Sequence, residues 1–228
     1  MRADGILFDK DGTLFDFDAT WVAWIEALIG RWAGADAGLR RALAEALGFD
    51  LAARRFHPRS IAIAGTPDEA AAAVAPVLGM AVPEIVVQLN AEAERAPMAE
   101  AVPLAPVLSA LRAKGLRLGV ATNDGEAPAR AHLAAAGVLA RFDFIAGSDT
   151  GHGAKPGPGM CTAFAAAMGL APGRVVMVGD SRHDLLAGRA AGMQVVGVLT
   201  GPAPADELAP LADAVLPDIG ELAAWLSG

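Results

Sequence analysis

The spacing of hydrophobic and polar residues along the chain changes character twice. Residues 5–8 form a short apolar run that predicts a buried strand. From about residue 15 to residue 95, apolar side chains instead recur at three- and four-residue spacing, which is typical of amphipathic helices. The clearest series is Trp21, Trp24, Ile25, Leu28 and Trp32. No strand pattern is found in this stretch, so we predict an all-helical insert directly after the first strand.

The predicted helices of the insert carry typical start and stop signals. A second apolar series, from Leu39 to Leu47, ends at Gly48, and glycine commonly follows the last turn of a helix. Thr66 is a good N-cap and is followed by proline at the first helical position. Pro83 begins a further helical series. These signals divide the insert into successive helices.

After residue 102 the pattern alternates between apolar strands and helical stretches. Strands are predicted at residues 116–121, 142–145, 174–178, 194–199 and 214–216. Helices are predicted between them at residues 106–114, 127–136, 160–168 and 184–191, and a last helix runs through Trp225. Strands separated by helices of this length favour a parallel sheet with helices on both faces. The predicted fold is therefore α/β, with a Rossmann-like core formed by residues 1–15 and 96–228 and the helical insert at residues 16–95.

Composition narrows the classes of protein that this pattern allows. The 228 residues are 54% hydrophobic, which is enough for a packed core, and the formal net charge is −8. An acidic chain argues against nucleic-acid and anionic-membrane partners, because both require clustered Lys and Arg. It does not exclude a phosphorylated substrate, since a bound metal can supply positive charge locally. The oligomeric state is not readable from the sequence.

Three features predict a cytoplasmic protein. The single cysteine, Cys161, cannot form an internal disulfide, which fits a reducing compartment. We expect it to be a small buried side chain on a helix. The predicted first strand begins within ten residues of the N-terminus, which leaves no room for a signal peptide. No uninterrupted apolar run is long enough to cross a membrane.

The candidate chemistry begins where the first strand ends. Asp9 and Asp11 are two residues apart, and side chains alternate faces along a strand, so both carboxylates can face one site. That site would lie at the carboxyl end of the strand, where open α/β sheets bind ligands. Gly12 allows the chain to turn sharply immediately afterwards. Taken alone, two solvated aspartates at the end of a strand would be the simpler explanation of this pattern.

Three later stretches also place polar residues at strand ends or in loops. Thr122 and Asn123 close one predicted strand, where a hydroxyl and backbone N–H groups can hold a phosphate. Lys155 lies in a loop rich in Gly and Pro. Asp180 and Asp184 follow another apolar strand, and helix capping would explain only one of these two carboxylates. Each stretch is weak evidence alone, and the case for a site rests on their combination.

Taken in order, these positions resemble the four motifs of the haloacid dehalogenase-like hydrolases, whose phosphatase members begin with Asp-x-Asp-Gly-Thr-Leu. The matching residues are Asp9 to Leu14, Thr122-Asn123, Lys155-Pro156, and Gly179-Asp180-Ser181 with Asp184, and the run from Gly188 to Gly192 is also similar. The helical insert stands where the family has its cap domain. The overall resemblance is to the phosphoglycolate phosphatase-like branch.

The resemblance implies roles for the four aspartates. Asp9 would be the nucleophile, and Asp11 would be the general acid and base. Mg²⁺ would be held by the carboxylates of Asp9 and Asp180 and by the backbone carbonyl of Asp11. Asp184 would bind the metal through water or orient its neighbours.

The remaining motif residues would bind phosphate. The resemblance assigns this role to Thr122, to the Asn123 N–H group and to Lys155. Lys10 is a departure, because members of the family more often have an apolar residue there. Its side chain is expected to point away from Asp9 and Asp11, with little effect on chemistry.

The predicted function is Mg²⁺-dependent hydrolysis of a small-molecule phosphate monoester through an aspartyl-phosphate, with phosphoglycolate as a candidate substrate. A sugar phosphomutase similar to β-phosphoglucomutase keeps all four motifs and stays an alternative. A haloacid dehalogenase is disfavoured, because such members need no Mg²⁺ and lack the second aspartate. Phosphonate cleavage is disfavoured because it requires a lysine in the cap, and residues 15–95 contain none.

A non-catalytic nucleotide- or phosphate-binding protein on a Rossmann-like sheet is a further class. Residues 151–156, Gly-His-Gly-Ala-Lys-Pro, superficially suggest a phosphate-binding loop. A P-loop needs Ser or Thr after Gly-Lys, and the dinucleotide-binding pattern needs Gly where Pro156 stands. Metal-dependent turnover of a phosphate ester would separate an enzyme from such a binding protein.

A basic cluster in the insert is a candidate for substrate specificity. Arg54, Arg55, His57 and Arg59 lie in a region otherwise rich in Ala and acidic residues. A solvated run of charge is the simplest explanation. The alternative hypothesis is that one of them reaches the site and binds a substrate carboxylate, which Arg can grip with two parallel hydrogen bonds. The substrate would then be a small anionic phosphate ester.

Overall fold

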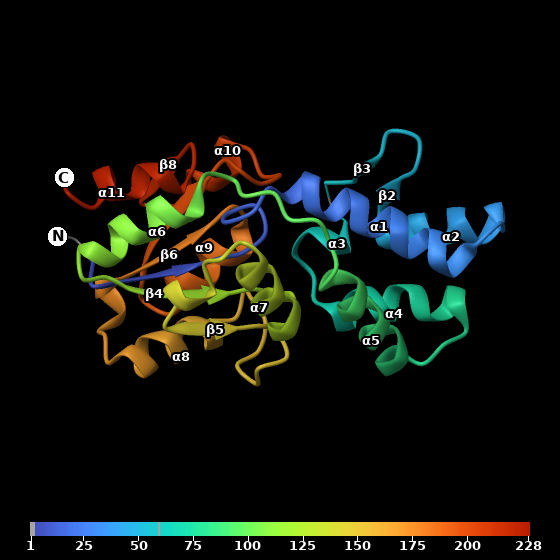
Figure 1. The fold of residues 1–228 in the computed structure, drawn as a ribbon, viewed down its shortest axis with the longest axis horizontal. Helices are drawn as coiled ribbons and strands as arrows, with labels where there is room; N and C mark the ends of the chain where they lie inside the picture. The colour runs from blue at the N-terminus through green and yellow to red at the C-terminus, as the bar shows by residue number, and fades with distance from the viewer. Residues whose placement is uncertain (1–2, 59) are drawn as a thin grey trace.

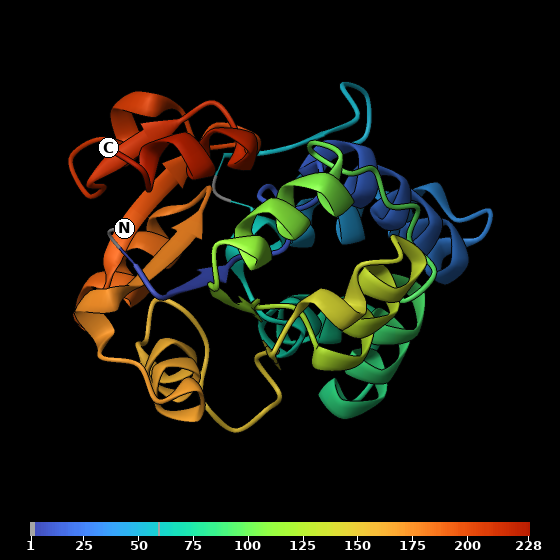
Figure 2. The ribbon, with the colours of Figure 1, turned by 60° about the vertical axis from the view of Figure 1, so that its left-hand side comes forward.

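The computed structural model describes residues 3–58 and 60–228 and shows two lobes, a larger core and a smaller cap (Figure 1). The core contains a six-stranded sheet whose strands are β1 (Gly5–Phe8), β4 (Arg117–Ala121), β5 (Phe144–Ala146), β6 (Val175–Gly179), β7 (Gln194–Val198) and β8 (Ala214–Leu216). All neighbours pair in parallel, in the order β5-β4-β1-β6-β7-β8. Figure 2 shows β1 (blue) with the orange C-terminal strands on one side and green β4 on the other. The predicted parallel sheet is confirmed, and β1 lies inside it.

Helices cover both faces of the sheet, as the sequence predicts. One face is covered by α6 (Leu104–Ala113), α7 (Glu126–Ala135) and α11 (Leu222–Trp225), and the other by α8 (Gly159–Met168), α9 (Arg182–Ala190) and α10 (Ala205–Leu208). Short 3-10 turns occur at Leu139–Arg141, Pro172–Arg174 and Ile219–Glu221. Because side chains alternate along a strand, β1 contributes Ile6 and Phe8 to one hydrophobic cluster and Leu7 to the other.

The cap is the insert that follows β1. Its helices are α1 (Phe17–Ala33), α2 (Ala37–Leu47), α3 (Ile61–Ala64), α4 (Pro67–Leu78) and α5 (Val82–Ala93). Among the described residues, the cap has a hydrophobic cluster of its own that shares no member with the two clusters of the core. Trp21 and Trp24 of the predicted amphipathic series belong to this cluster. The interior of the cap is therefore built separately from the interior of the core.

The cap also contains a small hairpin, so the prediction of an all-helical insert was incomplete. β2 (Phe49–Asp50) and β3 (Arg55–Phe56) pair antiparallel, and the rings of Phe49 and Phe56 meet edge to face at 5.1 Å between centroids. Strands of two residues show no alternation that a sequence pattern could reveal. The four-residue helices α3 and α10 are likewise too short to show a helical period.

Elsewhere the predicted elements agree with the structure to within about two residues. The predicted strand 214–216 is reproduced without change as β8. The helix predicted from residue 184 begins at Arg182, because Ser181 and Asp184 form a capping box at its start. Cys161 is buried on α8, as expected. In the part of the chain that is described, no single helix has the length and apolar character to span a membrane, and α4 with α5 meet those criteria only as a pair bent by 117°.

The two connections between core and cap run side by side. The backbone N–H of Asp16 donates to Ala99 O at 2.9 Å, and that of Ala101 donates to Leu14 O at 3.0 Å. The outgoing and returning chains therefore form a short antiparallel pair.

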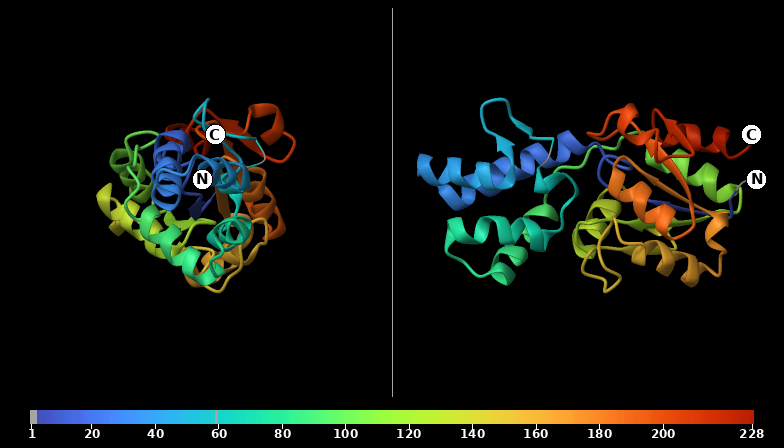
Figure 3. Two further views of the ribbon diagram at one scale, coloured as in Figure 1. Left: turned by 90° about the vertical axis from the view of Figure 1, so that its right-hand side faces the viewer. Right: turned by 180° about the vertical axis from the view of Figure 1, so that it is seen from behind.

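Helix α11 lies at the end of the core away from the cap (Figure 3).

The N-cap of α2 provides a test of the local structure of the cap. Asp36 Oδ1 accepts from the N–H groups of Gly38 and Leu39 at 2.8 and 2.9 Å. Asp36→Ala removes this acceptor and should lower the free energy of unfolding by about 1 kcal/mol. Asp36→Ser keeps a capping oxygen and should cost less. Urea denaturation followed by circular dichroism measures both, and equal losses in the two variants would contradict the capping role.

Candidate active site

The four sequence motifs meet at one edge of the sheet. β4, β1 and β6 are neighbours, so the residues after them, Thr122, Asp9 and Asp180, lie close together at the carboxyl ends. The loop before α8 brings Lys155 to the same place, and the start of α9 brings Asp184. The cap lies beyond this edge (Figures 1 and 3), and a cavity is enclosed between cap and core. The motif residues that line it are Asp9, Asp11, Thr122, Asn123, Lys155, Asp180 and Asp184.

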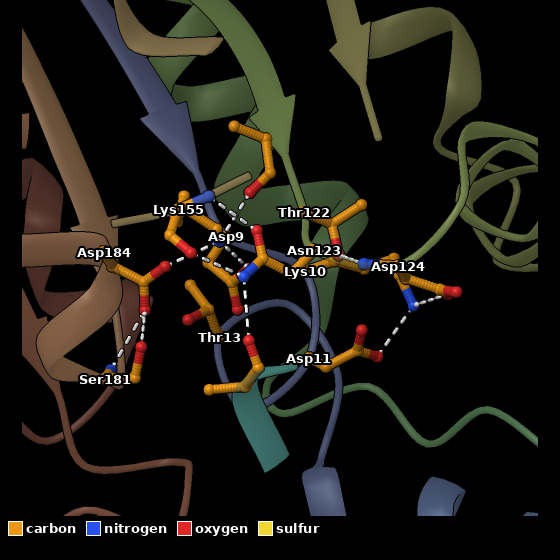
Figure 4. A network of polar contacts seen from close by, with 12 residues as sticks. Asp9, Lys10, Asp11, Thr13, Thr122, Asn123, Asp124, Lys155, Ser181 and Asp184 are labelled. Carbon is orange, nitrogen blue, oxygen red and sulfur yellow. Dashed lines mark hydrogen bonds and ion pairs between the residues drawn. The ribbon is translucent and has the colours of Figure 1, made fainter. Parts of the chain in front are cut away.

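Lys155 is a buried cation at the centre of the site. Its Nζ lies 2.5 Å from Asp9 Oδ1, 2.6 Å from Asp184 Oδ1 and 2.8 Å from Ala121 O (Figure 4). These three acceptors match the three hydrogens of an ammonium group. Burial alone would lower the pKa of Lys155, but the two carboxylates raise it above its ordinary value. The lysine is therefore charged and bound in place, unlike a solvated loop lysine.

Three buried carboxylates surround this cation. Asp9, Asp180 and Asp184 each offer an oxygen within 4.8 Å of the others. Burial raises the pKa of Asp9 to about 7, although Lys155 opposes this effect. Burial and the neighbouring Asp9 raise the pKa of Asp180 well above its ordinary value. Negative charge at the site therefore exceeds the positive charge that the described side chains provide.

This donor set fits a hard divalent cation. Mg²⁺ prefers oxygen ligands and commonly uses one or two carboxylates together with waters and substrate phosphate oxygens. A bound cation would also offset the excess negative charge, which adds to burial in raising the pKa of Asp9 and Asp180. The carboxylate of Asp11 is not a member of the group; the ligand expected from this residue is its backbone carbonyl.

Two glycines make room for the carboxylate of Asp180. Gly12 has a φ of +81°, and a Cβ there would lie 2.5 Å from Asp180 Oδ2. A Cβ on Gly201 would lie only 1.8 Å from the same oxygen. Thr13 Oγ1 donates to Asp180 Oδ1 at 3.4 Å, and Thr200 Oγ1 donates to Gly12 O at 2.6 Å. The turn after the first motif is thus shaped around Asp180.

Asp184 is held from two sides. Its Oδ2 accepts from Ser181 N at 3.0 Å and from Ser181 Oγ at 2.6 Å, while its Oδ1 accepts from Lys155. A Cβ on Gly179 would lie 2.2 Å from Asp184 Cβ, so the preceding strand must end in glycine. Asp184 therefore caps its helix and orients Lys155 at the same time.

Thr122 and Asn123 form the third wall of the site. Thr122 is buried, and its Oγ1 accepts from Asp124 N at 3.1 Å. The side chain of Asn123 accepts from Lys155 N at 2.8 Å and donates to Lys155 O at 2.9 Å, which fixes the lysine loop. It also donates to Ala64 O in the cap at 2.8 Å. The predicted phosphate contact uses the backbone N–H of Asn123, which has no acceptor among the described residues.

The structure corrects the expected orientation of Lys10. Its side chain was expected to point away from both aspartates, because neighbouring residues on a strand face opposite ways. The strand ends at Phe8, and Lys10 lies in the turn after it. There its Nζ reaches Asp11 Oδ1 at 2.7 Å. The two catalytic candidates therefore have different cations, Lys155 at Asp9 and Lys10 at Asp11 (Figure 4).

His132 supports Lys10 from α7. The imidazole Nδ1 lies 3.0 Å from Lys10 Nζ, and Nε2 lies 2.6 Å from Ala93 O. Since an ammonium only donates and a carbonyl only accepts, Nδ1 is the acceptor and the proton is on Nε2. Burial, together with the charge of Lys10, lowers the pKa of His132 to about 4. His132 is therefore neutral at pH 7.

The basic cluster of the cap is not brought to the site. Arg54 is exposed and binds Glu26 through Nε at 2.6 Å and Nη2 at 2.8 Å. Arg55 and His57 are exposed, and none of these three residues lines the cavity. Arg59 lies outside the described residues. A specificity role is therefore unsupported for Arg54, Arg55 and His57, because their side chains are exposed to solvent.

The cap contributes a mostly apolar wall to the cavity. Its larger side chains there are Phe17, Trp21, Trp24, Ile61, Ile63 and Leu89. Asn90 adds a polar group whose buried Oδ1 has no hydrogen-bond partner among the described residues. The space between cap and core amounts to about 740 Å³ when solvent at the open side is included.

Two residues of the site had no recognisable sequence signal. Asp124 lies just before α7 and His132 lies on that helix, where a polar residue is ordinary. Lys10 offered a partial signal, since a lysine between two buried aspartates must either find a partner or reach solvent. Two of its partners, Asp124 and His132, lie more than a hundred positions away in the sequence, so the sequence could not name them.

The depressed pKa of His132 predicts an effect of pH on stability. Between about pH 6.5 and pH 4 the unfolded chain binds a proton at this residue and the folded chain does not, so stability falls as the pH falls. From pH 7.5 to pH 5 the wild type should lose about 2 kcal/mol more than His132→Gln does. Chemical denaturation at the two pH values measures this difference. Parallel losses in the two proteins would contradict it.

Comparisons with known proteins agree with this geometry. The family profile of the haloacid dehalogenase-like hydrolases matches residues 3–192. A phosphoglycolate phosphatase from Rhodospirillum rubrum is 38% identical over 122 residues, which are 53% of this chain and 50% of that protein. A phosphoglycolate phosphatase from Escherichia coli (strain K12) is 39% identical over 98 residues, which are 43% of this chain and 39% of that protein. The matched stretch thus spans half or less of the length of these curated relatives.

The fold is also found among solved structures. A protein from Bacteroides fragilis described as a haloacid dehalogenase-like hydrolase superposes with a TM-score of 0.72 at 20% identity, covering 96% of this chain and 99% of that chain. At this identity the likeness shows the fold alone, an α/β core with a cap inserted after the first strand. The family profile covers most of the chain and all four motifs. The chain belongs to the haloacid dehalogenase-like hydrolase family.

Proposed function

We propose that this protein is a Mg²⁺-dependent phosphatase that hydrolyses a small-molecule phosphate monoester through an aspartyl-phosphate at Asp9. The observation that carries the proposal is the buried group of Asp9, Asp180 and Asp184 around Lys155, at a cavity between cap and core. Such a site suits phosphoryl transfer, which depends on positioning and on positive charge near the phosphoryl oxygens. The names of the curated relatives support the same class of reaction.

The metal would be held by the carboxylates of Asp9 and Asp180 and the backbone carbonyl of Asp11. When bound, it supplies positive charge that offsets the repulsion between a carboxylate and a phosphate dianion. Lys155 adds a fixed positive charge beside Asp9. Thr122 and the N–H of Asn123 would bind phosphoryl oxygens. These contacts would leave the phosphorus open to attack from Asp9.

The reaction then needs two displacements at phosphorus. A carboxylate oxygen of Asp9 forms a bond to phosphorus, the bond from phosphorus to the ester oxygen breaks, and Asp11 gives a proton to that oxygen. In the second step the oxygen of a water molecule attacks phosphorus, and Asp11 takes a proton from that water. The bond from phosphorus to Asp9 breaks, which restores the carboxylate and releases inorganic phosphate. The apolar wall of the cap limits the entry of other water.

Phosphoglycolate is the first candidate substrate, because both curated relatives described above carry that name. Incubation with Mg²⁺ and phosphoglycolate, within a panel of phosphorylated metabolites, tests both the reaction and the substrate. Release of inorganic phosphate supports a phosphatase. Transfer of the phosphoryl group to a second position on a sugar phosphate, without release, would instead indicate a phosphomutase.

The nucleophile can be tested by substitution. Asp9→Asn should abolish turnover and covalent labelling, because an amide oxygen cannot serve as this nucleophile. Asp11→Asn should keep the ability to be labelled but lose a factor of roughly 10²–10⁴ in turnover. Rapid quench with ³²P-labelled substrate, followed by mapping of the labelled peptide, distinguishes the two variants. Label on a Ser, Thr or His side chain would refute the assignment of Asp9.

Metal binding predicts a change in thermal stability that does not depend on activity. A ligand at 100 times its dissociation constant stabilises the folded state by about 2.7 kcal/mol, so Mg²⁺ should raise the melting temperature of the wild type. Asp180→Asn removes one carboxylate of the group and should abolish the increase. The exposed Asp206→Asn, which changes the net charge equally, should keep it. Scanning calorimetry with and without Mg²⁺ measures this, and equal increases in all three proteins would contradict a metal site at Asp180.

A further inference from the structure

Lys10 is a buried cation outside the group around Lys155. Its side chain is 0% exposed. The ammonium lies 2.7 Å from Asp11 Oδ1, 3.2 Å from Asp124 Oδ2 and 3.0 Å from His132 Nδ1. The ring of Trp21 in the cap faces it, with 5.3 Å between Nζ and the ring centroid. These neighbours come from the first motif, from the end of β4, from α7 and from α1.

Asp11 Oδ1 and His132 Nδ1 accept hydrogen bonds from the ammonium group, and Asp124 Oδ2 is its ion-pair partner, so Lys10 is held from three sides. His132 is itself fixed, because its Nε2 binds Ala93 O at 2.6 Å. Asp124 is fixed by Gly125 N, which donates to Oδ1 at 2.8 Å. Lys10 is therefore held by groups that are themselves held, and its position is well defined.

Burying an ammonium costs several kcal/mol of desolvation unless partners compensate, and an apolar side chain of similar length would avoid that cost. A role in packing alone therefore does not account for a lysine here. What the charge adds is a strong, directional hydrogen bond to Asp11. The proposed mechanism assigns proton transfer to that same carboxylate.

The contact leaves half of the carboxylate of Asp11 available. Oδ1 binds Lys10, and Oδ2 has no hydrogen-bond partner among the described residues. The residue lines the cavity, and its side chain is 13% exposed. Figure 4 shows Asp11 directed toward Lys10 and not toward Asp9. A carboxylate fixed through one oxygen presents the other in a restricted set of directions.

We propose that Lys10 is a positioning residue that holds Asp11 for protonation of the departing ester oxygen, an inference that rests on the proposed phosphatase function. Lys10 makes no contact with the substrate in this role and acts only through Asp11. Proton transfer matters most when the leaving group is a strong base, and a weakly basic leaving group departs without it. The contribution of Lys10 should therefore depend on the leaving group.

The test is a series of substituted phenyl phosphates, from phenyl phosphate to 2,4-dinitrophenyl phosphate, with Mg²⁺ present. The quantity measured is kcat/KM, which includes steps only as far as the first displacement, so the later attack of water on the aspartyl-phosphate does not enter. Lys10→Met should lower kcat/KM at least tenfold for phenyl phosphate and less than twofold for 2,4-dinitrophenyl phosphate. A plot of log kcat/KM against leaving-group pKa should become steeper than in the wild type. Asp11→Asn should show the same pattern with a larger loss.

A second variant separates positioning from folding. Lys10→Met leaves Asp11 and Asp124 as neighbouring carboxylates without their cation, which should lower stability. The double variant Lys10→Met/Asp124→Asn removes the second carboxylate and should recover melting temperature while keeping the steeper plot. Unfolded molecules lower kcat/KM by the same factor for every substrate in one preparation. The slope of the plot can therefore be measured even in an incompletely folded sample.

The outcomes are distinct. The inference is overturned if Lys10→Met lowers kcat/KM equally on all substrates or does not lower it at all. It is also overturned if the double variant has the slope of the wild type. Each of these results would show that Lys10 only supports the fold. If the wild type shows no Mg²⁺-dependent hydrolysis of any substrate in the series, the proposed function itself is refuted. A steeper plot in both Lys10 variants, matching Asp11→Asn in direction, supports the positioning role.

Discussion

The buried ammonium of Lys155 allows three carboxylates to occupy one small volume. Asp9 and Asp184 both contact it, and Asp180 lies within reach of both. Without an opposing charge, such a group would favour protonation over a nucleophilic carboxylate. Lys155 is held beside these carboxylates because the side chain of Asn123 binds both the backbone N–H and the backbone carbonyl of the lysine. The order β4-β1-β6 then places the remaining groups around this one cation.

A second cation divides the site into two parts. Lys155 serves the aspartate proposed as nucleophile, and Lys10 serves the aspartate proposed to move protons. Two carboxylates that lie two residues apart in sequence thereby acquire different surroundings. Different surroundings are what allow chemically identical side chains to perform different roles. The turn at Gly12, which leaves room for the carboxylate of Asp180 beside the two aspartates, completes this arrangement.

The sequence predicted the parts of the molecule that have a regular pattern. Long apolar strands and helices were recognisable by period, and the motif residues were identified by their resemblance, taken in order, to the four motifs of the family. The hairpin at Phe49 and Phe56 was missed because two-residue strands have no period. The sequence left the role of the basic cluster open, and only the fold shows that Arg54 turns outward to Glu26. Lys10 was misjudged because alternation applies within a strand and not to the turn after it.

The paired connections between core and cap have a mechanical consequence. Both chain crossings lie side by side and are joined by backbone hydrogen bonds, Asp16 to Ala99 and Ala101 to Leu14. A sliding of the cap across the core would shear these bonds, whereas a rotation about the paired strands would leave them intact. The pair is therefore stiff in translation and compliant in bending. A rotation of the cap about this pair would keep the two connections joined, and the pair lies next to the turn that carries Asp11.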